Sequence, residues 1–285
     1  MIEMIFWIVT TGFFLAVGIV IIDMHRFVTV ETRVQSEKIK EKVTVIVLAD
    51  LHGKRYGKEN CRLLRQIDKI QPDLILIAGD MLNAKPETDF SGTVRFIKRL
   101  AQKYTVFYGI GNHEHRLLLY PEVYGSMGEE YWRQLQDKNI VKLDNKKVYL
   151  EKQGICVYGA QIGKEYYKRF KIRPMEETYL KRILGEPRSD CFTILLAHNP
   201  DYFENYVSWG ADLIFSGHVH GGIVRLPFLG GVLSPACRLF PKYDGGMYKK
   251  KNSVMILSRG LGSHTIPIRF FNPGELHAVY LEPDT

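Results

Sequence analysis

Short β-branched runs alternate with amphipathic helical patterns from residue 43 onward, and this alternation constrains the fold more than any other feature. Residues 43–49 read as a buried strand, and the helical pattern that follows it ends at Pro72. Strand patterns recur at 74–78 and 105–110, with a helical pattern between them. Alternation of this kind is typical of an α/β protein.

The second half of the chain supplies another set of strand patterns, at 192–197, 212–215, 254–258 and 276–281. Two sheets are needed to use all of these strands. We therefore expect a four-layer α/β/β/α sandwich with two mixed sheets. The length of 285 residues, with 46% hydrophobic and 25% charged residues, suits one catalytic domain, which we place at 43–285.

Residues 4–22 carry no charge, and a stretch of that length spans the hydrocarbon core of a bilayer. A cleaved signal peptide is the alternative. The chain start has Glu3 but no Lys or Arg, and no small-x-small cleavage site follows the apolar run, so an uncleaved anchor is favoured. A buried amphipathic helix would need a polar face. We expect a single-pass membrane helix over residues 1–24.

The next segment, residues 25–42, mixes basic with acidic side chains and reads as a solvated connector. Basic residues follow the apolar span and none precedes it, so the positive-inside bias favours a cytoplasmic catalytic domain. Export of the domain remains the alternative.

The formal net charge of +8 suits an anionic substrate or an anionic lipid. The sequence contains no zinc-finger spacing, no heptad-linked basic region and no aromatic RNA-binding motif. We therefore expect no nucleic-acid partner.

Five strand patterns end in residues that bind metals or transfer protons. Ligands of open α/β sheets gather beyond the carboxyl ends of the strands, so we expect these side chains to share one site. In chain order they are Asp50, His52, Asp80, Asn112, His113, His198, His218 and His220.

The residue types indicate metals bound by oxygen and nitrogen. Carboxylate, amide and imidazole ligands suit manganese, iron or zinc, and the lack of any Cys-x-x-Cys pair argues against a thiolate site. Seven ligands are too many for one ion. Two divalent ions sharing a carboxylate would use them, and such a pair can hold both the attacking and the leaving oxygen of a phosphoryl group. We expect Mn²⁺ in preference to iron or zinc.

The blocks Asp50-Leu51-His52, Gly79-Asp80, Gly111-Asn112-His113-Glu114, His198 and Gly217-His218-Val219-His220 resemble, in family order, those of the calcineurin-like metallophosphoesterases. The stretch from Arg225 through Ser258 to Phe271 resembles the membrane-anchored bacterial branch. By this resemblance Asp50, His52 and His220 would hold one metal, and Asn112, His198 and His218 the other. Asp80 would bridge the two. Asn83 stands where many relatives carry Asp, at a position that is not a ligand.

The implied reaction is in-line attack on phosphorus by a hydroxide that bridges two metal ions. His113 would give a proton or hydrogen bond to the leaving oxygen. The alternative is a helix-start histidine oriented by Glu114. Arg259 lies in a glycine-flanked loop, where it would either grip a phosphate or be solvated.

The motifs predict a phosphoester hydrolase near a membrane surface, of the phosphodiesterase or pyrophosphatase class, with a lipid-linked or nucleotide-sugar substrate. A general phosphomonoesterase and a protein phosphatase share the same motifs. A non-catalytic scaffold with this fold is the remote alternative, because scaffolds usually show replaced ligands and all seven ligand positions here are competent.

Overall fold

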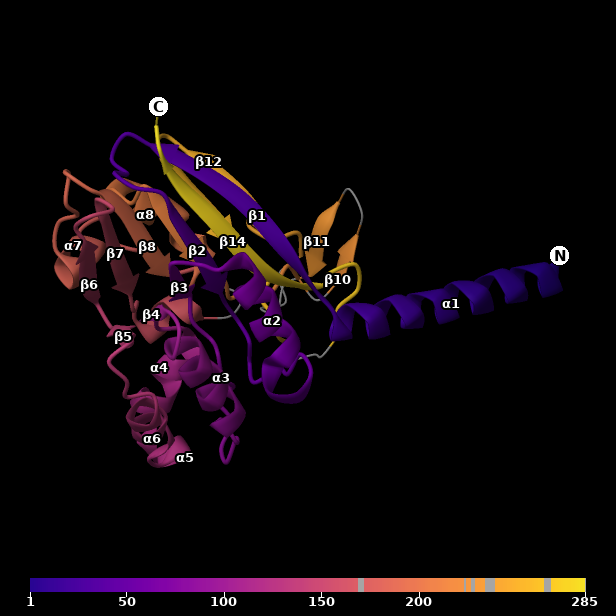
Figure 1. The fold of residues 1–285 in the computed structure, drawn as a ribbon. Helices are drawn as coiled ribbons and strands as arrows, with labels where there is room; N and C mark the ends of the chain where they lie inside the picture. The colour runs from indigo at the N-terminus through magenta and orange to yellow at the C-terminus, as the bar shows by residue number, and fades with distance from the viewer. Residues whose placement is uncertain (169–171, 223, 227–228, 234–238, 264–267, 285) are drawn as a thin grey trace.

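The computed structural model describes residues 1–285 apart from 169–171, 223, 227–228, 234–238, 264–267 and 285. Three hydrophobic cores define its layers. One core lies between two six-stranded sheets and includes Val47 and Phe107 from one sheet with Ile194 and Phe215 from the other. The other two cores lie between each sheet and its own helices. The expected four-layer α/β/β/α sandwich is confirmed (Figure 1).

The first sheet is parallel through its centre, where β2, β3, β4 and β5 pair in that order. Strand β14 is antiparallel to β2, and β1 is parallel to β14. Buried parallel strands are covered on both faces, which explains the unbroken apolar run of β3. In spatial order the strands are β1 (Phe27–Ser36), β14 (Gly274–Pro283), β2 (Val43–Leu48), β3 (Leu74–Ile77), β4 (Thr105–Gly109) and β5 (Ile140–Leu143).

The second sheet also has a parallel centre, β13-β9-β8-β7, with antiparallel strands β12 and β6 at its edges. In spatial order its strands are β12 (Gly246–Lys250), β13 (Ser253–Leu257), β9 (Leu213–Ser216), β8 (Phe192–Ala197), β7 (Ile155–Ala160) and β6 (Lys146–Leu150). A separate hairpin contains β10 (Val224–Leu226) and β11 (Gly230–Leu233).

Helices cover the outer faces because their apolar stripes pack on the sheets. The first sheet carries α2 (Cys61–Ile70), α3 (Ser91–Ala101), α4 (Asn112–Leu119), α5 (Pro121–Tyr124) and α6 (Met127–Gln134). The second carries α7 (Tyr179–Leu184) and α8 (Phe203–Trp209). Short 3₁₀ turns are η1 (Lys58–Asn60), η2 (Lys164–Tyr167) and η3 (Pro200–Tyr202).

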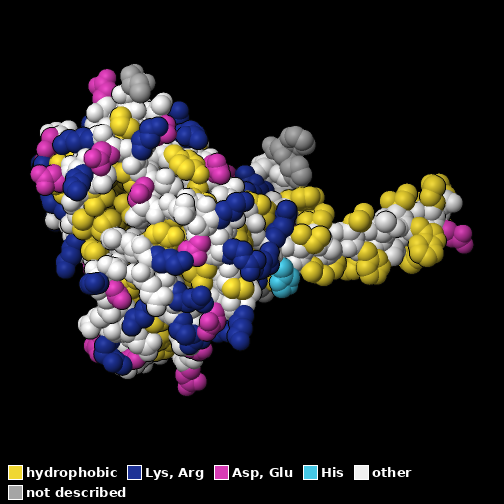
Figure 2. Space-filling view, in the orientation of Figure 1, with side chains coloured by type: hydrophobic (Ala, Val, Ile, Leu, Met, Phe, Trp, Pro, Cys, Tyr) yellow, Lys and Arg dark blue, Asp and Glu magenta, His cyan; other side chains and the backbone are white. Residues whose placement is uncertain are grey.

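Helix α1 (Ile2–His25) projects away from the domain (Figure 1), and most of its apolar side chains are exposed (Figure 2). Its mean hydropathy over an 18-residue window is 2.6, and none of that window is buried. The helix is therefore long and apolar enough to cross a membrane. A signal sequence near an N-terminus can have the same length and composition.

The solvated connector expected over residues 25–42 is corrected by the structure. Most of that segment is β1, which pairs with β14 along its whole length. The strand alternates half-buried residues such as Thr32 and Val34 with the exposed Glu31 and Arg33. An edge strand is covered on one side only, so its charged positions made it resemble solvated chain.

Candidate metal centre

The segments that directly follow β2, β3, β4, β8 and β9 carry all of the expected ligands. These strands run in parallel within their sheets, so their carboxyl ends meet along one edge of the sandwich. Neighbouring loops are also bonded to one another. The amide of His52 donates to the carbonyl of Asp80 at 3.1 Å, and the amide of Gly217 donates to that of His198 at 3.0 Å.

Five of the expected ligands occupy the left-handed backbone region, with φ between 47° and 74°. They are Asp50, His52, Asp80, His218 and His220. Asp and His tolerate this region better than most residues, yet it is sparsely populated outside glycine and marks sites where surrounding contacts impose the conformation.

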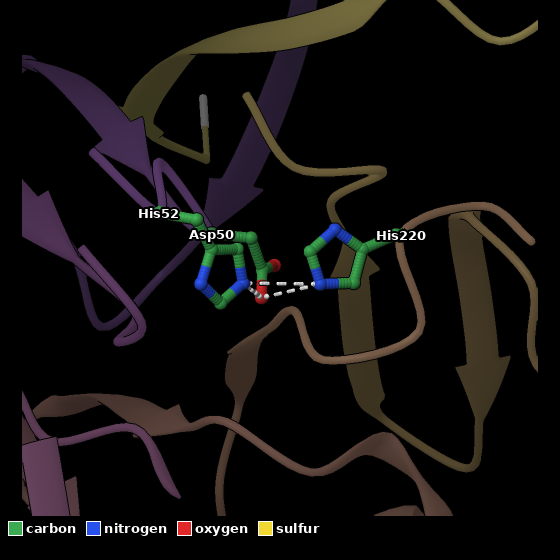
Figure 3. A group of neighbouring side chains, drawn as sticks. All are labelled: Asp50, His52 and His220. Carbon is green, nitrogen blue, oxygen red and sulfur yellow. Dashed lines mark hydrogen bonds and ion pairs between the residues drawn. The ribbon is translucent and has the colours of Figure 1, made fainter. Parts of the chain in front are cut away.

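The first group of converging side chains is Asp50, His52 and His220 (Figure 3). Asp50 Oδ1 lies 3.7 Å from His52 Nε2 and 3.4 Å from His220 Nε2. The two Nε2 atoms are 3.2 Å apart. A single cation among these three atoms would have an oxygen and two nitrogen ligands.

Asp80 lies between that group and a second one formed by His198 and His218. Its Oδ2 is 3.0 Å from His198 Nε2 and 3.9 Å from His52 Nε2. One carboxylate oxygen thus faces an imidazole from each group.

Backbone carbonyls orient three of these imidazoles. The Nδ1 atoms of His52, His198 and His220 lie 3.2, 2.7 and 3.1 Å from the carbonyl oxygens of Leu82, Ala78 and Gly262. A hydrogen bond from Nδ1–H to a carbonyl leaves the lone pair on Nε2, as in histidines that bind metals. Two lone pairs 3.2 Å apart, as at His52 and His220, repel unless a proton or cation lies between them.

Asn112 begins α4, between two residues that touch Asp80. The His113 amide donates to Asp80 Oδ1 at 2.8 Å, and a side chain at Gly111 would collide with that carboxylate. The Oδ1 atom of Asn112 is buried and has no hydrogen-bond partner among the described residues. Because a buried polar atom normally has a partner, this orphan fits an amide oxygen that binds a metal.

The charges of the site also favour cations. Burial alone would raise the pKa of Asp50 and Asp80, but the neighbouring histidines outweigh it and hold both below the usual range. Burial lowers the pKa of His198, while the charges of Asp80 and Asp50 prevail and raise it to about 10. Burial and His198 lower the pKa of His218 to about 4. A metal ion would satisfy the same two carboxylates and displace the His198 proton.

His113 differs from the other histidines in its hydrogen bonding. Its Nδ1 accepts from the amide of Ala84 at 2.8 Å, so the neutral ring carries its proton on Nε2. That nitrogen lies 3.9 Å from Asp80 Oδ2, at the edge of the group formed by His52, Asp80 and His113. His113 is thus presented as a hydrogen-bond donor to the centre.

Glu114 accepts hydrogen bonds around the loop that carries Asp80. Its buried carboxylate accepts from the amides of Asp80, Met81 and Gly111 at 2.9, 2.7 and 3.1 Å, and from the hydroxyl of Tyr108 at 2.8 Å. It therefore fixes the loop that presents Asp80. This function was not predicted; its one signal in the sequence is the position of Glu114 beside the ligands.

Arg259, expected as a phosphate contact, is bound to Glu275. Its Nε and one terminal nitrogen each lie 2.6 Å from Glu275 Oε1. Asn83 donates to the carbonyl of His52 at 3.0 Å, which supports the loop that carries His52. Arg259 as a substrate contact remains a prediction.

Comparisons with known proteins show which family the sequence matches. A family model described as calcineurin-like phosphoesterase matches residues 43–222. A putative metallophosphoesterase of Caenorhabditis elegans is 29% identical over 245 residues, covering 82% of this chain and 47% of that protein, so the chain spans about half its length. The phosphodiesterase YaeI of Escherichia coli is 27% identical, covering 77% of this chain and 75% of that protein. The UDP-2,3-diacylglucosamine pyrophosphatase LpxG of Chlamydia muridarum is 21% identical, covering 81% of each.

Proposed function

We propose that this chain, which belongs to the metal-dependent calcineurin-like phosphoesterases and is a phosphoester hydrolase, acts with two divalent metal ions on a phosphodiester or pyrophosphate at a membrane surface. The observation that supports two ions best is the position of Asp80, whose Oδ2 lies 3.0 Å from His198 Nε2 and 3.9 Å from His52 Nε2, one imidazole from each proposed ligand group.

One metal would be held by Asp50, His52 and His220, and the other by Asn112, His198 and His218. Asp80 would bridge them. The donor set of oxygen and nitrogen suits manganese, with iron and zinc as the alternatives. When bound, the metal pair supplies an ionised water for attack and positive charge for the phosphoryl oxygens.

The chain's own groups would complete the reaction. His113 holds a proton on Nε2 and would donate it toward the leaving oxygen, which otherwise departs as a costly alkoxide. Glu114 keeps Asp80 in place through three backbone amides. Carbonyl oxygens fix the rings of His52, His198 and His220, so little reorganisation is needed during catalysis.

The substrate class follows from the relatives and the apolar helix. One relative is named a phosphodiesterase and another a pyrophosphatase of a diacylated nucleotide sugar. Together with α1, these support a lipid-linked or nucleotide-sugar substrate and a single-pass membrane protein. Basic residues after the helix favour the cytoplasmic face. A general phosphomonoesterase or protein phosphatase is the alternative.

The test is hydrolysis by full-length protein loaded with manganese, iron or zinc. Alkyl phosphodiesters, nucleotide sugars, phosphomonoesters and a phosphopeptide form the substrate panel, and elemental analysis counts bound ions. We expect two ions per chain and turnover of diesters or pyrophosphates above that of monoesters. One ion per chain, or a preference for monoesters, would contradict the proposal. Asp80→Asn is the control that keeps side-chain volume while removing the bridging charge.

A further inference from the structure

The domain end of α1 is bonded to the catalytic domain. The buried Asp23 accepts from the amide of Asn272 at 2.8 Å, and the carbonyl of His25 accepts from the Arg62 side chain at 3.0 Å. One residue later, the carbonyl of Arg26 accepts from the amide of Gly274 at 3.3 Å. These bonds come from two different parts of the domain, so they fix the direction in which the helix leaves it.

The β10–β11 hairpin lies beside this junction (Figure 1). The amide of Arg225 in β10 donates to the carbonyl of Phe270 at 3.2 Å, two residues before Asn272. On the other strand, the amide of Phe240 donates to the carbonyl of Val232 at 3.0 Å. A continuous run of backbone contacts therefore connects the helix end to the segment around Phe240.

Exposed hydrophobic side chains concentrate along this run. Among the described residues outside α1, half of the exposed large hydrophobic side chains belong to it, including Leu239 at 69% and Phe240 at 63% exposure. A grouped apolar surface on a folded domain usually marks a contact site. We call these residues the collar: Leu229, Leu239, Phe240, Ile268 and Phe271.

Basic side chains accompany the collar. Arg62 is exposed where it contacts the helix end, and Lys54 lines a cavity together with Met24 of α1 and the buried Arg269. Figure 2 shows Lys, Arg and hydrophobic side chains gathered where α1 leaves the domain. Apolar groups with adjacent cations are the composition of segments that lie in the headgroup region of a bilayer.

The same junction adjoins the metal centre. The Asn272 side chain donates to the carbonyls of His220 and Gly222 at 2.7 and 2.9 Å, while its amide donates to Asp23. A single residue thus connects an expected metal ligand with the last turns of α1.

We propose that the collar is a membrane-contact surface that inserts beside α1 into the boundary between headgroups and acyl chains, with Lys54 and Arg62 against anionic headgroups. The inference rests on the proposed function in one respect, namely that α1 spans a bilayer. The metal centre is then held at headgroup level, where the phosphorus of a lipid-linked substrate lies. We take a lipid bilayer as the partner of the collar because the collar is continuous with a helix that is long and apolar enough to cross a bilayer.

The test places a fluorescent nitrobenzoxadiazole probe on full-length protein in phosphatidylcholine–phosphatidylglycerol vesicles. The probe is attached at Phe240→Cys in a Cys61→Ser, Cys237→Ser background, since Cys156 and Cys191 are buried. The matched control is Val123→Cys, an exposed apolar position on α5, far from α1 in Figure 1. We expect nitroxide-labelled lipids to quench the probe at position 240 and aqueous iodide to quench it at position 123.

Two results would overturn the inference, and they are distinguishable. If the protein resists carbonate extraction but iodide quenches both probes equally, the collar stays in water and the membrane anchor stands. If carbonate releases the protein from the vesicles, both the anchor and the collar contact are refuted. Hydrolysis of a soluble diester by each labelled protein reports whether the metal centre has folded.

Discussion

Replacing His113 by Gln tests the assignment of the proton donor. The ring nitrogen Nδ1 accepts from Ala84, so Nε2–H faces the centre, and a glutamine cannot release a proton there. We expect kcat on an alkyl diester to fall by about 10²–10⁴, the usual contribution of a positioned acid, which corresponds to roughly 3–5 kcal/mol in the barrier. Metal content should remain near that of the wild type, because the substitution removes no proposed ligand.

The leaving group separates acid catalysis from a structural effect. A nitrophenolate departs without protonation, so His113→Gln should cost far less on a nitrophenyl diester than on an alkyl diester. Initial rates on both substrates, with elemental analysis of the same samples, make the comparison. The matched control is His115→Gln, two residues along α4 and outside the three ligand groups, which should leave both rates unchanged. Equal losses on both esters would refute the acid role of His113.

Four further perturbations probe the centre and its surroundings. Asp80→Ala should lower bound metal and abolish hydrolysis, and two tightly bound ions in that variant would contradict the bridge. Glu114→Gln leaves at least one of three backbone amides without an acceptor, so we expect the free energy of unfolding to fall by about 1–3 kcal/mol. An unchanged denaturant midpoint would argue against this. Burial raises the pKa of Glu275, but His277 and Arg259 outweigh burial and lower the pKa from 4.5 to about 2. The ionised carboxylate therefore stabilises the fold above pH 4.5, and this stabilisation is lost as the pH falls toward 2. In Glu275→Gln, the loss of unfolding free energy between pH 4.5 and pH 2 should therefore be smaller by about 3 kcal/mol. An unchanged pH dependence of the unfolding free energy would contradict this role of Glu275. Deleting residues 1–21, which keeps Asp23, should abolish membrane integration and preserve hydrolysis of soluble esters; loss of both would indicate that α1 is needed for folding.

The strand-end residues were predictable because their signal is local. A short β-branched run followed by Asp, Asn or His appears directly in the sequence, and parallel strands then bring such ends together. The structure places seven of the eight side chains in three overlapping groups, and it leaves the amide oxygen of Asn112 as a buried orphan beside them. The four-layer sandwich followed from the same alternation.

Contacts between remote segments had no such signal. The charged residues of β1 made it resemble solvated chain, because only one side of this strand is covered. Nothing in the local sequence indicates that β14 lies between β1 and β2 in the sheet. Glu114 acts on backbone amides more than 30 residues away, and Asn272 acts on carbonyls about 50 residues away. Backbone partners leave no pattern in side-chain sequence, so roles of this kind emerge only from coordinates.

Because residues 27–36 form β1 and pair with β14, the catalytic domain lacks the reach that a flexible connector would give it. A flexible segment of about twenty residues would let the domain sample a few tens of ångströms above the bilayer. The bonds of Asp23, His25 and Arg26 to the domain remove that freedom. If α1 spans a bilayer, the metal centre stays at one depth, set by Asn272 between Asp23 and His220. An enzyme built this way would select substrates by the height of their phosphorus above the acyl chains as well as by their chemistry.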